Sequence, residues 1–125
     1  MSLKVNVNVN RPKVKQLSEA TKKAISMTAE QLRTEVIQEQ LIPFDTGHLQ
    51  NVQTYIDRDA LSKGQVKIVH DTPYAARLYF NPQFDFSTDT NANARGEWWE
   101  PWISGENSKR PSELFRQFYR NITGV

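Results

Sequence analysis

The feature that most constrains the fold is a long run of residues at helical spacing between two prolines, Pro12 and Pro43. Apolar and small side chains recur every three or four positions along this run, as they do on the buried face of an α-helix. Proline is favoured in the first turn of a helix and stops a helix that reaches it. We therefore predict one long helix that starts at Pro12 and ends before Pro43. Its buried face is predicted to hold Val14, Leu17, Thr21, Ala24, Ile25, Thr28, Leu32, Val36 and Ile37.

Three short segments show the alternating pattern of β-strands with one buried face. The first precedes the helix, where Leu3, Val5, Val7 and Val9 alternate with Lys4, Asn6, Asn8 and Asn10. The other two carry Val52, Thr54 and Ile56, then Val66, Ile68 and His70. Turn-forming residues at 62–65 separate them, so we predict an antiparallel hairpin.

Two further helices are predicted in the second half of the chain. Asp71-Thr72-Pro73 is a helix-start signal, and the helix that follows places Tyr74, Ala75, Leu78 and Tyr79 on one face and ends before Pro82. Residues 81–95 are polar without periodicity, which is typical of a long exposed loop. Pro111 begins a final helix through Leu114, Phe115, Phe118 and Tyr119.

These elements predict an α+β fold in a single domain, residues 1–125. A small antiparallel sheet, made of the N-terminal strand and the hairpin, packs against one long helix, and shorter helices follow towards the C-terminus. The formal net charge of +2 gives no bulk argument for binding nucleic acid or membranes. The chain has no cysteine, which excludes disulfides and thiol chemistry. No apolar segment approaches the length of a membrane span, so we expect the protein to be made and kept in the cytoplasm.

Asp45-Thr46-Gly47 is the tripeptide that aspartic proteases use, in which two aspartates share a proton and activate water. A homodimeric protease of this size is therefore an alternative function. That chemistry requires the aspartate at the end of a buried strand in an almost all-β chain, whereas here it follows a long helix and a proline. We interpret the tripeptide as a turn, with the Asp45 carboxylate engaged in hydrogen bonds.

Metal and cofactor chemistry find no support in residue spacing. His48 and His70 could bind a metal together with nearby aspartates, but no helical pair of ligands exists. We expect a surface or turn role for both histidines, with His70 stabilising the start of the helix that follows it. Glycine loops that cradle phosphate and serine-nucleophile motifs are absent from the sequence. We predict no catalytic residue, no metal and no cofactor.

The C-terminal helix carries a basic group beside aromatic residues, which is a pattern that can grip phosphates and stack on bases. The basic residues are Lys109, Arg110, Arg116 and Arg120. Because the aromatics lie at core spacing, an amphipathic helix docked on the domain explains the same pattern. A DNA-binding accessory protein therefore stays as a second alternative function.

All three tryptophans lie within five positions, at Trp98, Trp99 and Trp102. Tryptophan is enriched in binding hot spots, and these residues follow a long polar loop. The alternative is that one or two of them close the core of a small domain. Both hold if Trp98 or Trp99 is buried and its neighbour faces outward, which is what we expect. The candidate interface residues are Arg77, Tyr79, Arg95, Trp98, Trp99 and Trp102.

The order of these motifs resembles that of the minor capsid proteins of tailed phages, which are related to head-closure and tail-completion components. Motifs that carry the resemblance are Pro43-Phe44-Asp45-Thr46-Gly47-His48-Leu49, Thr72-Pro73-Tyr74-Ala75-Ala76-Arg77-Leu78-Tyr79 and Asn93-Ala94-Arg95-Gly96-Glu97-Trp98-Trp99-Glu100. They cover most of the chain, from the long helix to the tryptophans. Members of the broader group often carry Glu-Phe-Gly after the Tyr-Ala helix, where this chain has Tyr79-Phe80-Asn81-Pro82.

The resemblance implies a structural protein at the head-to-tail junction of the virion, at the portal vertex, made in the cytoplasm of a host bacterium. Its partners would be other connector proteins, either portal and adaptor or tail terminator. Ring-forming connectors associate head to tail, so each subunit needs two complementary patches. The lysine-rich first half and glutamate-rich second half of the long helix, and the tryptophan segment with residues 81–95, are candidates for these contacts. Alone and dilute, the protein is expected to be a monomer.

Overall fold

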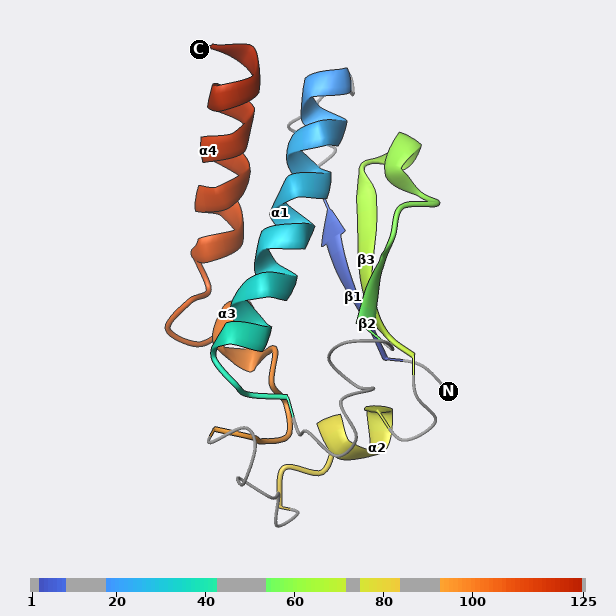
Figure 1. Cartoon of the computed structure of the whole chain (residues 1–125), viewed down its shortest axis with the longest axis vertical. Coiled ribbons are helices and arrows are strands. Elements are labelled where there is room, and N and C mark those ends of the chain that lie inside the picture. The colour runs from blue at the N-terminus through green and yellow to red at the C-terminus, as the bar shows by residue number, and fades with distance from the viewer. Residues whose placement is uncertain (1–2, 9–17, 43–53, 72–74, 84–92, 125) are drawn as a thin grey trace.

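The computed structural model describes residues 3–8, 18–42, 54–71, 75–83 and 93–124. It has an α+β fold (Figure 1) with a three-stranded antiparallel sheet in the order β1-β3-β2. The strands are β1 (Leu3–Asn8), β2 (Thr54–Asp57) and β3 (Gln65–His70). The helices are α1 (Glu19–Gln38), α2 (Ala75–Tyr79), α3 (Glu100–Ile103) and α4 (Arg110–Thr123), and a 3₁₀ turn, η2, covers Leu61–Lys63.

The central strand β3 aligns the whole sheet. His70 lies opposite Leu3 of β1 on one side and opposite Thr54 of β2 on the other. Val66, Ile68 and His70 are all fully buried, as the alternation predicts for the face of a strand that packs on the core. The hairpin closes through η2 and Gly64, whose φ of 79° is a left-handed conformation that glycine adopts without strain. The predicted N-terminal strand and antiparallel hairpin are therefore confirmed.

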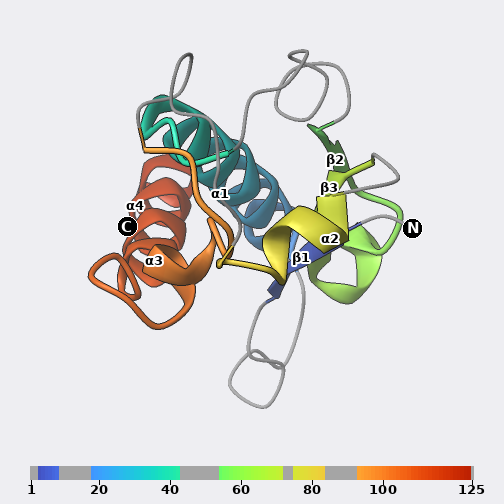
Figure 2. The same cartoon turned by 90° about the horizontal axis from the view of Figure 1, so that it is seen from below.

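Helix α1 lies between the sheet and α4 (Figures 1 and 2), so it buries side chains on two sides. Its buried residues are Thr21, Ala24, Ile25, Thr28, Ala29, Leu32 and Val36. The start predicted at Pro12 is wrong: Ser18 is extended, and its hydroxyl accepts a hydrogen bond from the Thr21 amide at 3.1 Å. A serine N-cap favours the start of a helix at the next residue, because its hydroxyl supplies an acceptor for an otherwise unpaired amide of the first turn. Val14 and Leu17 lie outside the described residues.

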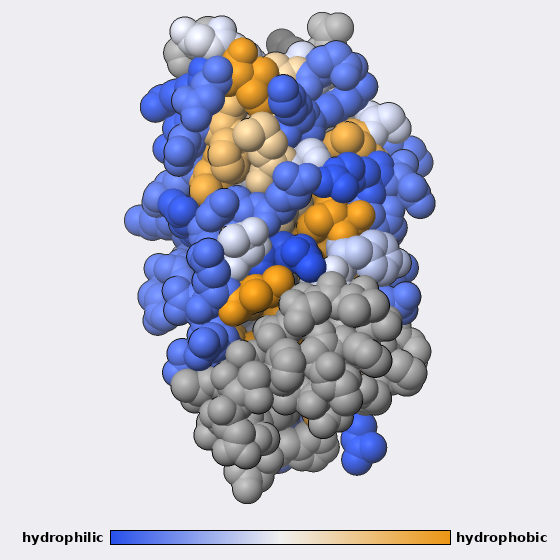
Figure 3. Space-filling view, viewed as in Figure 1, coloured by the Kyte–Doolittle hydropathy of each residue, from blue (hydrophilic) through white to orange (hydrophobic). Residues whose placement is uncertain are grey.

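Helix α4 runs alongside α1 and completes the core. Leu114 is buried, and Phe115 and Phe118 pack partly buried against the same cluster. The predicted final helix is confirmed, as is the short helix before Pro82, here α2. The sequence did not predict α3. In the space-filling view (Figure 3), apolar side chains are visible between the hydrophilic ridges of the two long helices.

The turn motif predicted around Asp45 lies outside the described residues, together with Pro43, Thr46, Gly47, His48, Leu49 and Tyr74. Ala75, the described member of the Tyr-Ala motif, is fully buried. Within the described ranges, none of the helices has the length and hydropathy needed to cross a bilayer.

Candidate protein-docking site

The tryptophan segment is part of the core. Trp98, Trp99 and Trp102 expose 0%, 1% and 4% of their surface. The expectation that one of the adjacent pair faces outward is therefore wrong. Trp98 packs edge-on against Tyr79 of α2, with ring centroids 4.8 Å apart, and Trp99 packs edge-on against Trp102 at 5.7 Å. Such aromatic pairs each contribute about 0.5–1.5 kcal/mol beyond the burial of their area.

A single buried acceptor explains why both adjacent tryptophans turn inward. The indole Nε1 of Trp98 donates a hydrogen bond to His70 Nε2 at 3.2 Å, and that of Trp99 donates to the same nitrogen at 2.9 Å. Indole N–H groups only donate, so His70 Nε2 must be unprotonated. We therefore assign the neutral tautomer with the proton on Nδ1, which donates to Thr54 Oγ1 at 3.0 Å.

The surface or turn role predicted for His70 is thus wrong. The side chain is fully buried and joins β2, β3 and the tryptophan segment. Its place at the last position of the inward-facing alternation Val66, Ile68, His70 was the available signal. That signal gives burial, but it does not give the partners, which lie 28 and 29 residues further along the chain.

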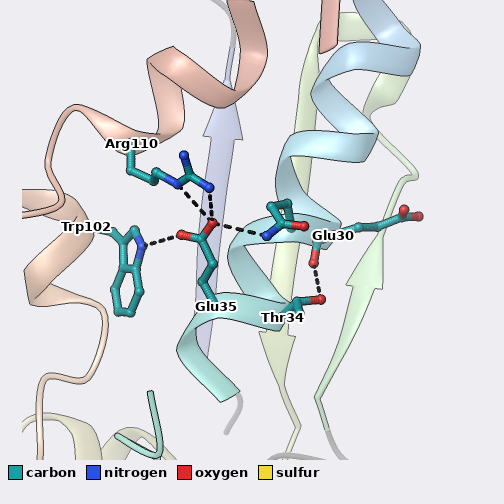
Figure 4. A network of polar contacts seen from close by, with 6 residues as sticks. Glu30, Thr34, Glu35, Trp102 and Arg110 are labelled. Carbon is teal, nitrogen blue, oxygen red and sulfur yellow. Dashed lines mark hydrogen bonds and ion pairs between the residues drawn. The ribbon is translucent and has the colours of Figure 1, made fainter. Parts of the chain in front are cut away.

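Glu35 of α1 is hydrogen-bonded to Trp102 of α3 and to Arg110 at the start of α4 (Figure 4). Its carboxylate accepts hydrogen bonds from Trp102 Nε1 at 3.1 Å, Arg110 Nε at 2.9 Å and Gln31 Nε2 at 3.2 Å. Burial raises the pKa of Glu35, but the hydrogen bonds from Arg110, Gln31 and Trp102 and the charge of Arg110 outweigh it, so the net pKa is lowered. The network ties α1 to α3 and α4.

A tight turn at Gly96 and Glu97 directs the segment into the core. A Cβ on Gly96 would lie 2.8 Å from Pro82 Cα and 3.0 Å from the Leu78 carbonyl oxygen, so only glycine fits. Glu97 has a φ of 47°, an uncommon value for a residue with a side chain, and its amide donates to the Tyr79 carbonyl oxygen at 2.8 Å. This backbone bond fixes the turn against α2.

A groove of about 570 Å³ lies between this turn, α3 and β1; we call it the β1 groove. It is lined by Leu3, Lys4, Val5, Asn6, Tyr79, Phe80, Glu97, Glu100 and Ile103. Phe80 and Ile103 are 65% and 59% exposed. The Tyr79 hydroxyl is sensitive to both carboxylates: burial first, then the charges of Glu100 and Glu97, raise the pKa of Tyr79 to about 12.

A second groove, of about 450 Å³, lies along the opposite edge of the sheet, between β2 and α1; we call it the β2 groove. It is lined by Glu30, Arg33, Thr34, Thr54, Tyr55, Ile56 and Arg58. Arg33 donates to the Thr54 carbonyl oxygen through Nε at 3.2 Å and Nη2 at 3.0 Å, which covers part of this strand edge. Arg58 pairs with Glu30 and donates to Ser26 Oγ at 2.7 Å. Tyr55 is 45% exposed.

The structure separates the candidate interface residues into two groups. Arg77 and Arg95 are exposed, whereas Tyr79 and the three tryptophans are buried, and Tyr79 also lines the β1 groove. Among the described residues, the large exposed apolar side chains are Phe80, Ile103 and Tyr55, none of which was a candidate interface residue. Phe80 and Ile103 each follow a buried aromatic residue, so no periodic signal distinguished them. Tyr55 stands between Thr54 and Ile56 in β2, and that alternation already placed it on the outward face.

Other surfaces offer less. On α4, Arg116 and Arg120 are exposed beside Glu113, Gln117 and Asn121 around a shallow polar hollow of about 280 Å³. No three histidine, aspartate or glutamate side chains in the described part of the chain come together as a metal site would require.

Comparison with known proteins gives no relative: no family model, no curated protein and no solved structure matches this chain.

Proposed function

We propose that this chain is a structural minor capsid protein of a tailed phage or prophage, a head-to-tail connector of the head-closure or tail-completion kind. It acts by protein-protein assembly at the portal vertex and is not an enzyme. The observation that carries the proposal is the β1 groove, where Phe80 and Ile103 are exposed next to β1, an outer strand of the sheet that the described residues form. The order of the sequence motifs, which resembles that of minor capsid proteins of tailed phages, supports a head-to-tail connector as the kind of assembly.

An exposed apolar groove is costly for a protein that works alone. Soluble monomers rarely expose contiguous apolar surface unless it binds something, and an open strand edge invites pairing with another chain. Phe80 and Ile103 both line the same hollow, whereas most other large apolar side chains among the described residues are buried or partly buried. A binding surface for another protein explains this placement.

In this role the protein is made in the cytoplasm of the host bacterium and ends at the head-to-tail junction of the virion. Its partners are other connector proteins, portal and adaptor on the head side or terminator on the tail side. Head-to-tail contacts close into a ring on assembly, and each subunit then uses two different surfaces. The isolated, dilute protein is a monomer.

Immunogold labelling of purified particles tests the proposal. We expect label at the neck, and we expect a phage that lacks the gene to accumulate heads and tails that are not joined. A complementing copy with Phe80→Ser and Ile103→Ser should restore joining poorly, while the matched change of exposed Gln117→Ser on α4 should restore it fully. Particles that carry no label, or that join normally without the gene, would contradict the proposal.

A DNA-binding accessory role has one observation in its favour, the exposed Arg116 and Arg120 one turn apart on α4. Binding through phosphates weakens steeply as salt rises. If the protein binds duplex DNA in this way, replacing both arginines by glutamine should flatten the salt dependence by about two charges. Absence of DNA binding, or a salt dependence that the double variant leaves unchanged, removes this alternative.

A further inference from the structure

The two edges of the sheet carry complementary surfaces. The β1 groove has one lysine against two glutamates, Lys4 with Glu97 and Glu100, whereas the β2 groove has two arginines against one glutamate, Arg33 and Arg58 with Glu30. The first surface is therefore net acidic and the second net basic, each by one charge. Opposite local charge of this kind steers two surfaces together and fixes their register.

Exposed apolar side chains follow the same division. Three large hydrophobic residues are exposed in the described part of the chain, and all three line these two grooves. Phe80 and Ile103 flank the β1 groove, and Tyr55 projects at the β2 groove. Aromatic anchors that fill apolar pockets on a partner dominate protein interfaces, and tyrosine is among the residues enriched there.

Because β1 and β2 are the two outer strands of one sheet, these surfaces face away from each other. Figure 2 shows β1 and β2 on opposite sides of β3, with α2 near the β1 side. The two edges of one molecule cannot meet, but the β1 edge of one copy can meet the β2 edge of another. Such a contact is heterologous, so each copy keeps one free surface. The assembly closes as a ring if the rotation between copies closes, and otherwise it grows as a filament.

We propose that the β1 groove of one copy binds the β2 edge of a second copy of this chain. Tyr55 of the second copy lies against Phe80 and Ile103 of the first, and Arg58 faces Glu97 and Glu100. Arg58 is 41% exposed in its pair with Glu30, so its guanidinium can turn on the surface towards an incoming carboxylate. This inference rests on the proposed ring-forming role and names the contact by which the ring forms.

Cysteine cross-linking tests the contact directly, since the chain has no cysteine of its own. Chains that carry Tyr55→Cys and Ile103→Cys are purified separately, mixed at high concentration and treated with a short bismaleimide. We expect the mixed 55–103 product to exceed the product of either chain alone. The control mixture replaces Ile103→Cys by Gln117→Cys, an exposed site on α4. Equal yields from the two mixtures, or a product formed only between identical chains, would overturn the proposal.

Reversing the charges at Glu97 and Arg58 tests the contact independently. Sedimentation over a range of concentrations measures the self-association of each variant. Glu97→Lys and Arg58→Glu should each weaken self-association by roughly tenfold or more, since close interfacial charge pairs contribute on that scale. A chain that carries both changes should recover most of the self-association. Glu113→Lys, the same charge change on exposed α4, should have no effect, and thermal unfolding confirms that each variant is folded. A wild-type chain that stays monomeric at every concentration refutes self-association.

The two proposals fail separately. Self-association of the purified chain with no label at the virion neck would remove the connector role and keep the contact. Neck labelling with no 55–103 product and no response to the charge exchange would keep the role and remove the contact. In that case the β1 groove binds a different connector protein.

Discussion

Replacing His70 by phenylalanine should destabilise the fold more than the change in size suggests. His70→Phe keeps a planar ring of similar volume but removes the acceptor shared by Trp98 and Trp99, which lies 3.2 and 2.9 Å from their indole nitrogens. Each buried donor left without a partner costs about 1–3 kcal/mol, so two cost about 2–6 kcal/mol. A domain is stable by about 5–15 kcal/mol, so this loss is a large part of the total.

The matched variant is His70→Gln, whose amide oxygen reaches roughly the position of Nε2 and can accept from both indoles. Urea unfolding followed by circular dichroism gives the free energy of unfolding of each variant. We expect the wild-type protein to be the most stable, His70→Gln to be intermediate and His70→Phe to be the least stable. A His70→Phe protein as stable as His70→Gln would refute the shared-acceptor reasoning. Nitrogen NMR of the imidazole should independently show the proton on Nδ1.

Three further predictions concern other parts of the structure. The fold lowers the pKa of Glu35 from 4.5, so the stabilisation by its carboxylate is complete above pH 4.5 and is lost as the pH falls through the folded pKa. Glu35→Gln should therefore reduce the loss of unfolding free energy between pH 6 and pH 3, measured by urea unfolding. Gly96→Ala places a Cβ 2.8 Å from Pro82 Cα and should lower the stability of the wild-type protein by about 1–3 kcal/mol, measured by thermal unfolding. Phe80→Ser should change the unfolding free energy by less than about 0.5 kcal/mol, because the side chain is 65% exposed, while incorporation into particles falls.

Each of these has a result that counts against it. A Glu35→Gln protein with the same acid sensitivity as wild type would mean that other carboxylates control unfolding in that range. A Gly96→Ala protein with the melting temperature of the wild type would show that the Gly96 turn relaxes at little cost. A large loss of stability in Phe80→Ser would place that side chain in the core and remove it from the docking surface.

Local patterns predicted the elements of the fold because each element repeats its own periodicity. Alternation from Leu3 to Asn8 and from Val66 to His70 gave two strands, and the spacing of Ala24, Ile25, Thr28 and Leu32 gave the buried side of α1. The start of α1 was missed because apolar residues at helical spacing continue before Ser18. The serine that caps the first turn is a single polar residue and has no periodic signal.

The candidate site could not be predicted in the same way, since it depends on contacts between distant residues. Burial of both Trp98 and Trp99 follows from one nitrogen of His70, and the position of Trp102 follows from Glu35, which is 67 residues away. The exposure of Phe80 depends on α2 ending at Tyr79 and on the tight approach of Gly96 to Pro82. Sequence spacing within either segment contains none of this information.

The bond between Arg110 and Glu35 has a practical consequence for anyone who shortens this protein. Helix α4 looks in outline like a removable C-terminal tail, yet its first residue neutralises a carboxylate that is only 16% exposed. Truncation before Arg110 would leave that charge beside Trp102 without a cation and would uncover one side of α1. Deletion mapping of binding activity in this region would therefore report misfolding, and point substitutions on the outer side of α4 are the sound way to dissect it.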